Sequence, residues 1–191
     1  MTDHCQRPSK LRPMQRAWLA LPSLLLASPV AAQDVSYGPV FTEFGPVADV
    51  PDADFAIPED ASFHVAFDVS RAAEEGKLNR GFESAARLIN MHSRAGVEPM
   101  ENRAAVVVHG PAVLDLLTDA AWVARDRGEA NPSGAMVREM IDQGVRFIVC
   151  GQSAAGQGVA KSELIPGVEL ALSAMTAHAL LQQQDYTVNP F

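Results

Sequence analysis

Three short stretches of the chain have the apolar patterns of β-strands. Residues 63–69 alternate apolar and polar side chains and are rich in strand formers. Residues 104–108 are wholly apolar, which is typical of a central parallel strand buried on both faces. A third apolar run, 146–150, ends at Cys150 and is followed by a loop of small residues. We therefore expect a sheet that contains these three strands.

Helical patterns separate and follow the strands. Asn79 is placed to cap a helix that runs to about Ala95, and Gly96 is a natural stop for it. Later elements are expected as a helix that begins near Pro111, a helix that ends at Gly144, one long helix over 168–184 and a short strand over 186–188. Strands that alternate with helices predict an α/β fold, a three-layer α/β/α sandwich with a mainly parallel sheet.

A proline-rich segment, 33–62, precedes the α/β pattern. Gly-Pro-Val occurs at 38–40 and again at 45–47, and prolines at this density exclude helix and central strand. The aromatic and aliphatic side chains between the prolines are too apolar for a free linker. We expect an extended arm that packs across the domain or onto a neighbouring subunit. A loose acidic lead-in is the alternative.

Residues 1–32 have the composition of a secretory signal peptide. A basic leader precedes an apolar core that is too short to span a bilayer as a mature helix, and small residues come before Gln33. We expect cleavage between Ala32 and Gln33 and a periplasmic or secreted protein. An uncleaved membrane anchor is the alternative. No second apolar segment approaches spanning length, so no membrane contact is expected after cleavage.

Signal cleavage changes the charge and the cysteine count. The 15 basic and 23 acidic residues fall to 11 and 22, because residues 1–32 hold four of the former and one of the latter, and the net charge moves from −8 to −11. A chain this acidic is not expected to bind nucleic acid or an anionic membrane. Cys5 leaves with the signal, so Cys150 becomes the single thiol and no disulfide can form within the mature chain.

Cys150 and His109 each follow a predicted strand. Because the carboxyl ends of parallel strands meet at one edge of a sheet, the two side chains could approach each other there, and an imidazolium beside a thiol lowers its pKa. The backbone amides of Gly151, Gln152 and Ser153 would stabilise a thiolate or a bound anion in the same way. The alternatives are a Cys150 that only packs and a His109 that only completes a turn.

Other site types find less support in the sequence. Asn90, near the end of the first long helix, is a more distant candidate for substrate binding. The histidines show no paired spacing with each other or with Cys150, so no metal site is expected. Neither a dinucleotide-binding nor a phosphate-binding glycine motif is present, and no cofactor is expected.

The segment 149–159 resembles the cysteine motif of the DsrE/DsrF-like family of sulfur-relay proteins. In that motif a strand ends in the sulfur-carrying cysteine and a Gly-Val pair follows eight residues later, as Gly158-Val159 does here. The resemblance covers about 63–191, taken as the DsrE/F-like domain, and Cys-Gly-Gln-Ser at 150–153 together with 172–176 is similar to an exported subgroup. In the family's relays basic residues usually precede the glycine, whereas Gly156 and Gln157 stand there in this chain.

This resemblance implies a three-layer α/β/α fold, homo-oligomers that are trimers or hexamers, and a persulfide on Cys150. The first hypothesis is therefore a periplasmic sulfur-handling protein, a sulfurtransferase-like carrier that exchanges sulfane sulfur with a donor or acceptor protein. The second is a non-catalytic oligomeric binding or assembly module in which Cys150 is core packing. The third is a thiol-dependent redox enzyme, which would need an external thiol because the mature chain has no resolving cysteine.

Overall fold

The computed structural model describes residues 34–189, and the predicted signal peptide lies outside them. Five strands are present: β1 (Phe63–Val69), β2 (Asn102–Val108), β3 (Arg146–Cys150), β4 (Glu169–Ala171) and β5 (Thr187–Asn189). Five α-helices accompany them: α1 (Arg80–Arg94), α2 (Asp119–Val123), α3 (Gly134–Asp142), α4 (Gly151–Gly156) and α5 (Ala174–Gln182). Three 3₁₀ helices complete the elements: η1 (Pro99–Glu101), η2 (Gly110–Leu116) and η3 (Lys161–Glu163).

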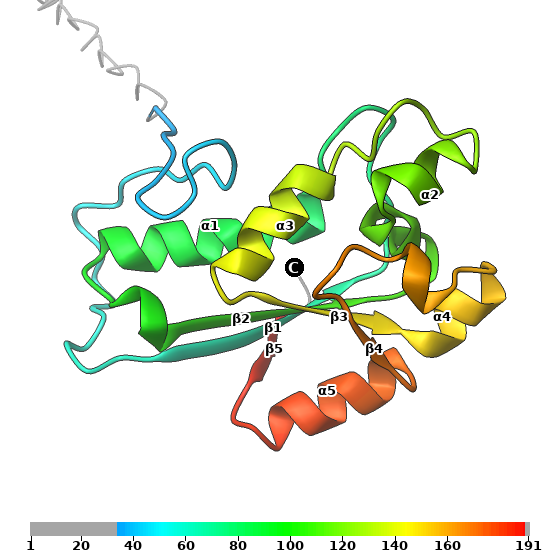
Figure 1. Ribbon diagram of the computed structural model, residues 1–191. Coiled ribbons are helices and arrows are strands. Elements are labelled where there is room, and N and C mark those ends of the chain that lie inside the picture. The colour runs from blue at the N-terminus through cyan, green and yellow to red at the C-terminus, as the bar shows by residue number, and fades with distance from the viewer. Residues whose placement is uncertain (1–33, 190–191) are drawn as a thin grey trace, which may run out of the picture. The chain divides into compact units, whose positions relative to one another are not determined.

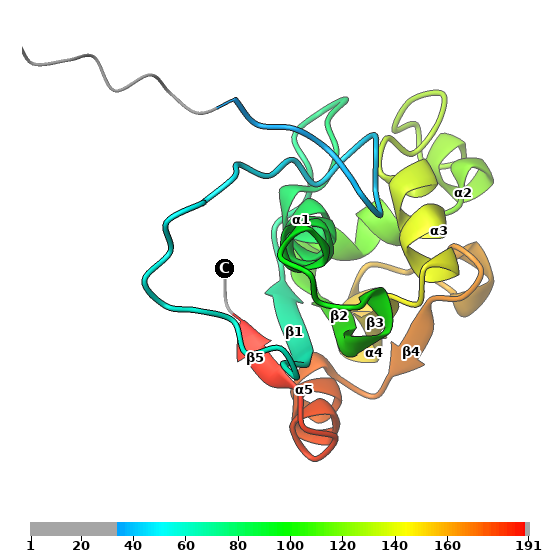
Figure 2. The same cartoon turned by 90° about the vertical axis from the view of Figure 1, so that its left-hand side faces the viewer.

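The five strands form one parallel sheet in the order β4-β3-β2-β1-β5, which can be followed in Figure 2. Strand β2 lies at its centre, and Ala104 to Val108 are all buried there, as its unbroken apolar pattern predicts. The predicted α/β sandwich with a parallel sheet is confirmed.

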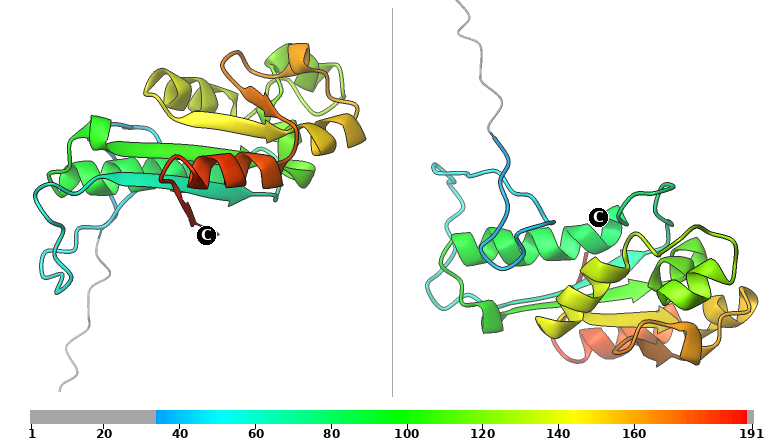
Figure 3. Two further views of the ribbon diagram at one scale, coloured as in Figure 1. Left: turned by 90° about the horizontal axis from the view of Figure 1, so that it is seen from below. Right: turned by 45° about the horizontal axis from the view of Figure 1, so that its top comes forward.

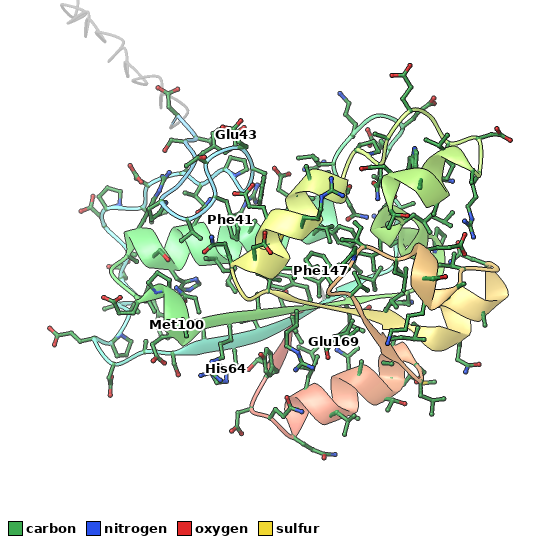
Figure 4. All side chains as sticks on the ribbon, in the orientation of Figure 1. Phe41, Glu43, His64, Met100, Phe147 and Glu169 are labelled. Atoms are coloured by element: carbon green, nitrogen blue, oxygen red, sulfur yellow. The ribbon has the colours of Figure 1, made fainter. Side chains whose placement is uncertain are left out.

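Helices cover both faces of the sheet. Helices α1 and α3 lie on one face and α5 lies on the other (Figure 1). The larger buried cluster packs between the sheet and α1 and α3, and the rings of Phe82 and Phe147 meet there edge to face at 5.2 Å. Phe147 is labelled in Figure 4. The smaller cluster joins Ala105, Val107 and Ile148 of the sheet to Ala177 and Leu181 of α5.

The strand order explains why α5 lies on the face of the sheet opposite to α1 and α3. The chain moves in one direction across the sheet from β1 to β4, and then returns past the whole sheet to β5. Because crossovers between parallel strands are right-handed, a connection that reverses direction must pass over the opposite face. Helix α5 makes that return and lies in front of the sheet in the left panel of Figure 3.

The sequence prediction of the first helix is confirmed, and that of the final helix is wrong. Asn79 caps α1 by accepting hydrogen bonds from the backbone N–H groups of Gly81 and Phe82. The predicted helix over 168–184 is instead strand β4, a turn and helix α5. The reason is that Val149 pairs with Leu170 and thereby draws this segment into the sheet, and that Ser173 caps a new helix through the N–H of Thr176.

The first part of the arm packs on α1. Phe41, Phe44 and Val47 are buried, and the backbone of Ser36 pairs with that of Val47 in both directions. The right panel of Figure 3 shows this segment crossing α1. The second part is exposed, and Phe55 keeps 95% of its accessible surface. No helix within 34–189 is long and apolar enough to cross a bilayer.

Buried Asp115 fixes the loop that connects β1 to α1. Its Oδ2 atom accepts hydrogen bonds from the N–H of Ala73 and from Nδ2 of Asn79, each at 2.7 Å. Burial raises the pKa of Asp115 above its ordinary 3.8, although these two hydrogen bonds oppose the rise. The folded chain therefore holds this proton more strongly than the unfolded chain does.

Asp115→Asn is expected to raise the melting temperature at neutral pH. Since the pKa of Asp115 is higher in the folded state, its contribution to stability is complete in acid and is lost as the pH rises through a window that begins near 3.8. The asparagine keeps an acceptor oxygen for both donors and removes the buried charge. Thermal unfolding followed by circular dichroism should show a flatter pH dependence in that window. Exposed Asp52→Asn is the control, and an equal gain from it would contradict the prediction.

Candidate functional site

Cys150 is the last residue of β3 and the residue that precedes α4. Its backbone is extended, with φ −68° and ψ 114°, and it pairs with Ala171 of β4. The residue is only 5% exposed, so the thiol lies just beneath the surface. Gly151 is required next to it, because a Cβ atom at that position would lie 2.6 Å from the carbonyl oxygen of Ala171.

Four donors surround the sulfur. Burial raises the pKa of the Cys150 thiol, but the hydroxyl of Ser153 and the backbone N–H groups of Ser153, Ala174 and Gln152 donate to it and outweigh that effect. The net result is a pKa below the ordinary 9.0. Because the donors come from the first turns of two helices, α4 and α5, the site favours the thiolate on the sulfur.

Ser153 and Gln157 join α4 to the strand end beside it. The N–H of Gly110 donates to Oγ of Ser153 at 3.0 Å, which leaves the Ser153 hydroxyl hydrogen free for the sulfur. Nε2 of Gln157 donates to the carbonyl oxygen of Gly110 at 2.6 Å. These two bonds hold the loop after β2 against the helix that carries the Cys150 donors.

His109 lies beside Cys150 but is bonded elsewhere. The pairing of Val108 with Val149 places the next residues of the two strands, His109 and Cys150, side by side. The ring of His109 is directed to Asp68 of β1, with Nε2 at 3.3 Å from Oδ2 and 3.2 Å from Oδ1. The hydrogen bonds that lower the thiol pKa come from Ser153, Ala174 and Gln152, and His109 is not among them.

A second histidine shares the same carboxylate. Nε2 of His178, on α5, lies 2.8 Å from Oδ1 of Asp68. Burial raises the pKa of Asp68, but the hydrogen bonds from His178 and His109 outweigh it, and the pKa is lowered. Asp68 is therefore an ionised carboxylate between two imidazole rings.

The remaining candidate, Asn90, lies away from this edge. It is fully buried on α1, where Oδ1 accepts from the N–H groups of Val40 and Phe41 and Nδ2 donates to the carbonyl oxygens of Phe41, Phe44 and Gly45. All of its polar atoms hold the arm. The structure brings together Cys150, Gly151, Gln152, Ser153 and His109, and it does not bring Asn90 to them.

Asp68, His178 and Ala174 were missed by the reading of the sequence. Asp68 was seen only as a polar position of an alternating strand, and His178 fell within the helix that was wrongly extended back to 168. The available signal for Asp68 was its place near a strand end, directly before Val69, the last residue of the alternating segment 63–69. No comparable local signal marks His178 or Ala174.

A hollow opens beside Asp68. It has a volume of about 890 Å³ and is lined by the loop after β1 and the first turn of α1, with the cations Arg71, Lys77 and Arg80 among its lining residues. Within 34–189, no group of three or more histidine, cysteine, aspartate or glutamate side chains is arranged to hold a metal ion.

Known proteins of solved structure are similar to this chain. A protein of unknown function from Methanobacterium thermoautotrophicum, MTH1491, is 19% identical over 68% of this chain and all of its own length, with a TM-score of 0.50. The ychN protein from E. coli is 20% identical over 68% of this chain and all of its own, with a TM-score of 0.46. No curated protein matches the chain. The model of the DsrE/DsrF-like family matches residues 64–190, so the chain belongs to the DsrE/DsrF-like family.

Proposed function

We propose that this protein handles sulfur and carries sulfane sulfur as a persulfide on Cys150. The observation that carries the proposal is the set of four donors that lower the thiol pKa of a cysteine at the end of a parallel strand. A thiolate is the form that attacks sulfur, and the same N–H groups would stabilise the persulfide anion after transfer. Membership of the DsrE/DsrF-like family supports this chemistry.

The transfer step conserves atoms and electrons. The Cys150 thiolate attacks the outer sulfur of a donor persulfide R–S–SH, a bond forms between the two sulfurs, and the bond from that sulfur to the donor breaks. The donor leaves as a thiolate and takes up a proton. Delivery to an acceptor thiol is the same exchange in reverse, with the acceptor as the attacking group.

The setting of this activity is also a proposal. We infer an exported protein, periplasmic or secreted, from the basic leader and the apolar core within residues 1–32. We further infer trimers or hexamers and a sulfur donor or acceptor protein as partner. The support for a protein contact near the site is the exposure of Leu172, which follows β4, and of Met175, in the first turn of α5, which keep 72% and 81% of their surface.

A persulfide donor tests the proposal. The full chain is incubated with glutathione persulfide and digested, and the peptide that contains Cys150 is weighed. The expected result is a gain of one sulfur atom on that peptide, its loss on treatment with dithiothreitol, and no gain in Cys150→Ser. Ser153→Ala is expected to reduce the rate, because it removes one donor from the thiolate. A Cys150 peptide of unchanged mass would eliminate the proposal.

One observation favours a second function, a non-catalytic assembly module. Cys150 is 5% exposed, as a packing residue would be. This function predicts that iodoacetamide modifies Cys150 only after unfolding, whereas the sulfur carrier must react while folded. Comparing peptide alkylation with and without urea separates the two.

A further inference from the structure

We propose that Asp68 and His178 are positioning residues of the Cys150 site, which hold His109 so that its Nδ1 atom takes the proton from the thiol. The sulfur-transfer step in this inference rests on the proposed function, but the arrangement itself can be tested on the thiol alone.

The side chains of Asp68, His109 and Cys150 lie on the same face of the sheet. Side chains alternate along a strand, so Asp68 shares the face of Ala66, and Cys150 shares that of Ile148, which packs under α5. His109 continues β2 with an extended backbone, φ −144° and ψ −178°, and therefore shares the face of Val107. Neighbouring strands are about 4.8 Å apart, which places His109 between Asp68 and Cys150.

Helix α5 connects the thiol of Cys150 to the carboxylate of Asp68. The N–H of Ala174 donates to the Cys150 sulfur, and His178, four residues later, lies on the same side of the helix. His178 then contacts Asp68 at 2.8 Å, and Asp68 contacts His109. One turn of α5 thus spans the distance from the thiol to the carboxylate.

The hydrogen-bond partners of His109 and His178 show which ring nitrogen of each carries hydrogen. Asp68 accepts at both histidine Nε2 atoms, so each Nε2 carries hydrogen. Nδ1 of His178 is buried without a hydrogen-bond partner among the described residues, and a bare lone pair is tolerated there better than an N–H⁺ group. His178 is thereby suited to hold Asp68 in place. Nδ1 of His109 is the ring atom left to accept a proton.

Few other ionisable groups face this edge. Neither α4 nor α5 carries an ionisable side chain apart from His178. His64 and Arg103 pair at the amino ends of β1 and β2, about four residues and ~13 Å from Asp68 along the strand. The remaining neighbours are Arg146 and Glu169, which pair with each other, Asp115, which holds Ala73, and Arg71.

The step balances on this arrangement. The proton of the Cys150 thiol moves to Nδ1 of His109, and Asp68 stabilises the resulting imidazolium through Nε2–H. The thiolate attacks the outer sulfur of the donor persulfide, and the departing donor thiolate takes the proton back from Nδ1. His109 returns to neutral, and no external oxidant or reductant is needed.

The pH profile of Cys150 alkylation tests the inference. The full chain is treated with iodoacetamide, and modification of the Cys150 peptide is timed across a range of pH. Asp68→Asn is expected to move the pH midpoint of alkylation upward. At pH values below the midpoint it should slow alkylation ~10-fold, which corresponds to one pKa unit. His109→Gln should do the same. His178→Gln keeps a donor for Asp68 and should stay near wild type, whereas His178→Ala should shift as Asp68→Asn does.

Exposed Asp49→Asn is the charge-matched control and should leave the midpoint in place. Coincident profiles for wild type, Asp68→Asn and His109→Gln would overturn the inference. If Asp68→Asn fails to fold, the comparison of His178→Gln with His178→Ala decides it. Sulfur uptake with coincident profiles would reject this inference alone, and a shifted profile without sulfur uptake would support it and reject the proposed function alone.

Discussion

Gly151→Ala is expected to destabilise the protein by about 1–3 kcal/mol and to raise the pKa of the Cys150 thiol. The added Cβ atom would lie 2.6 Å from the carbonyl oxygen of Ala171 and 3.2 Å from that of Leu172. Both are backbone atoms, so relief requires β4 to move away from β3. Such a movement also withdraws the N–H of Ala174 from the sulfur. Urea unfolding would show the loss of stability, and the alkylation midpoint would rise.

Gly156→Ala is the matched control in the same helix. Nothing lies within 4 Å of a Cβ atom built at that position. Alanine there should be neutral or add about 0.4–1 kcal/mol, because it restricts the unfolded chain. If Gly151→Ala and Gly156→Ala have equal unfolding midpoints, close packing of β4 against α4 is not the reason for glycine at 151.

Asn90→Ala is expected to cost about 2–5 kcal/mol and to release the arm from α1. The substitution leaves the N–H groups of Val40 and Phe41 and the carbonyl oxygens of Phe41, Phe44 and Gly45 without their partner. Each buried group left unpaired costs about 1–3 kcal/mol, and partial hydration of the loosened arm reduces the sum. Urea unfolding measures the loss, and limited proteolysis should cut between 34 and 47.

Two variants sharpen this experiment. Asn90→Asp keeps the two acceptor interactions but sets a buried carboxylate oxygen against three carbonyl oxygens, so at neutral pH its loss of stability should be at least as large as that of Asn90→Ala. Met91→Ala, at the next and 44% exposed position of α1, should leave both stability and proteolysis nearly unchanged. An arm that stays protected in Asn90→Ala would show that the buried rings of Phe41 and Phe44 hold it without the hydrogen bonds.

Most of the sheet was predictable because its strands are marked by local patterns. The bounds expected for β1 and β3 agree with the structure, and Asn79 marks the start of α1 through its own side chain. The region after Val168 was not predictable in this way. Its apolar residues fit a helix as well as a strand, and the pairing of β4 with β3 that decides between them is a long-range contact.

In the site, too, residues marked by local sequence were predictable and residues brought in by long-range contacts were not. Cys150 and Ser153 follow directly from a strand end and a short helix, so sequence reasoning found them. The contact of Asp68 with His178 could not be predicted in this way, because the two residues are 110 positions apart and meet only when α5 packs on the sheet. Asn90 was proposed for a ligand since a buried amide and a binding amide have the same sequence signature, and only its five backbone partners separate the two.

The return of the chain over the far face of the sheet also sets an order of events during folding. Cys150 and the donors of α4 come from one continuous stretch, whereas the N–H of Ala174 and the ring of His178 arrive with α5, after β4 has been made. A nascent chain that ends before Ser173 therefore holds a thiol with an incomplete set of donors. The full set of donors to the Cys150 sulfur is present only once α5 has docked on the sheet.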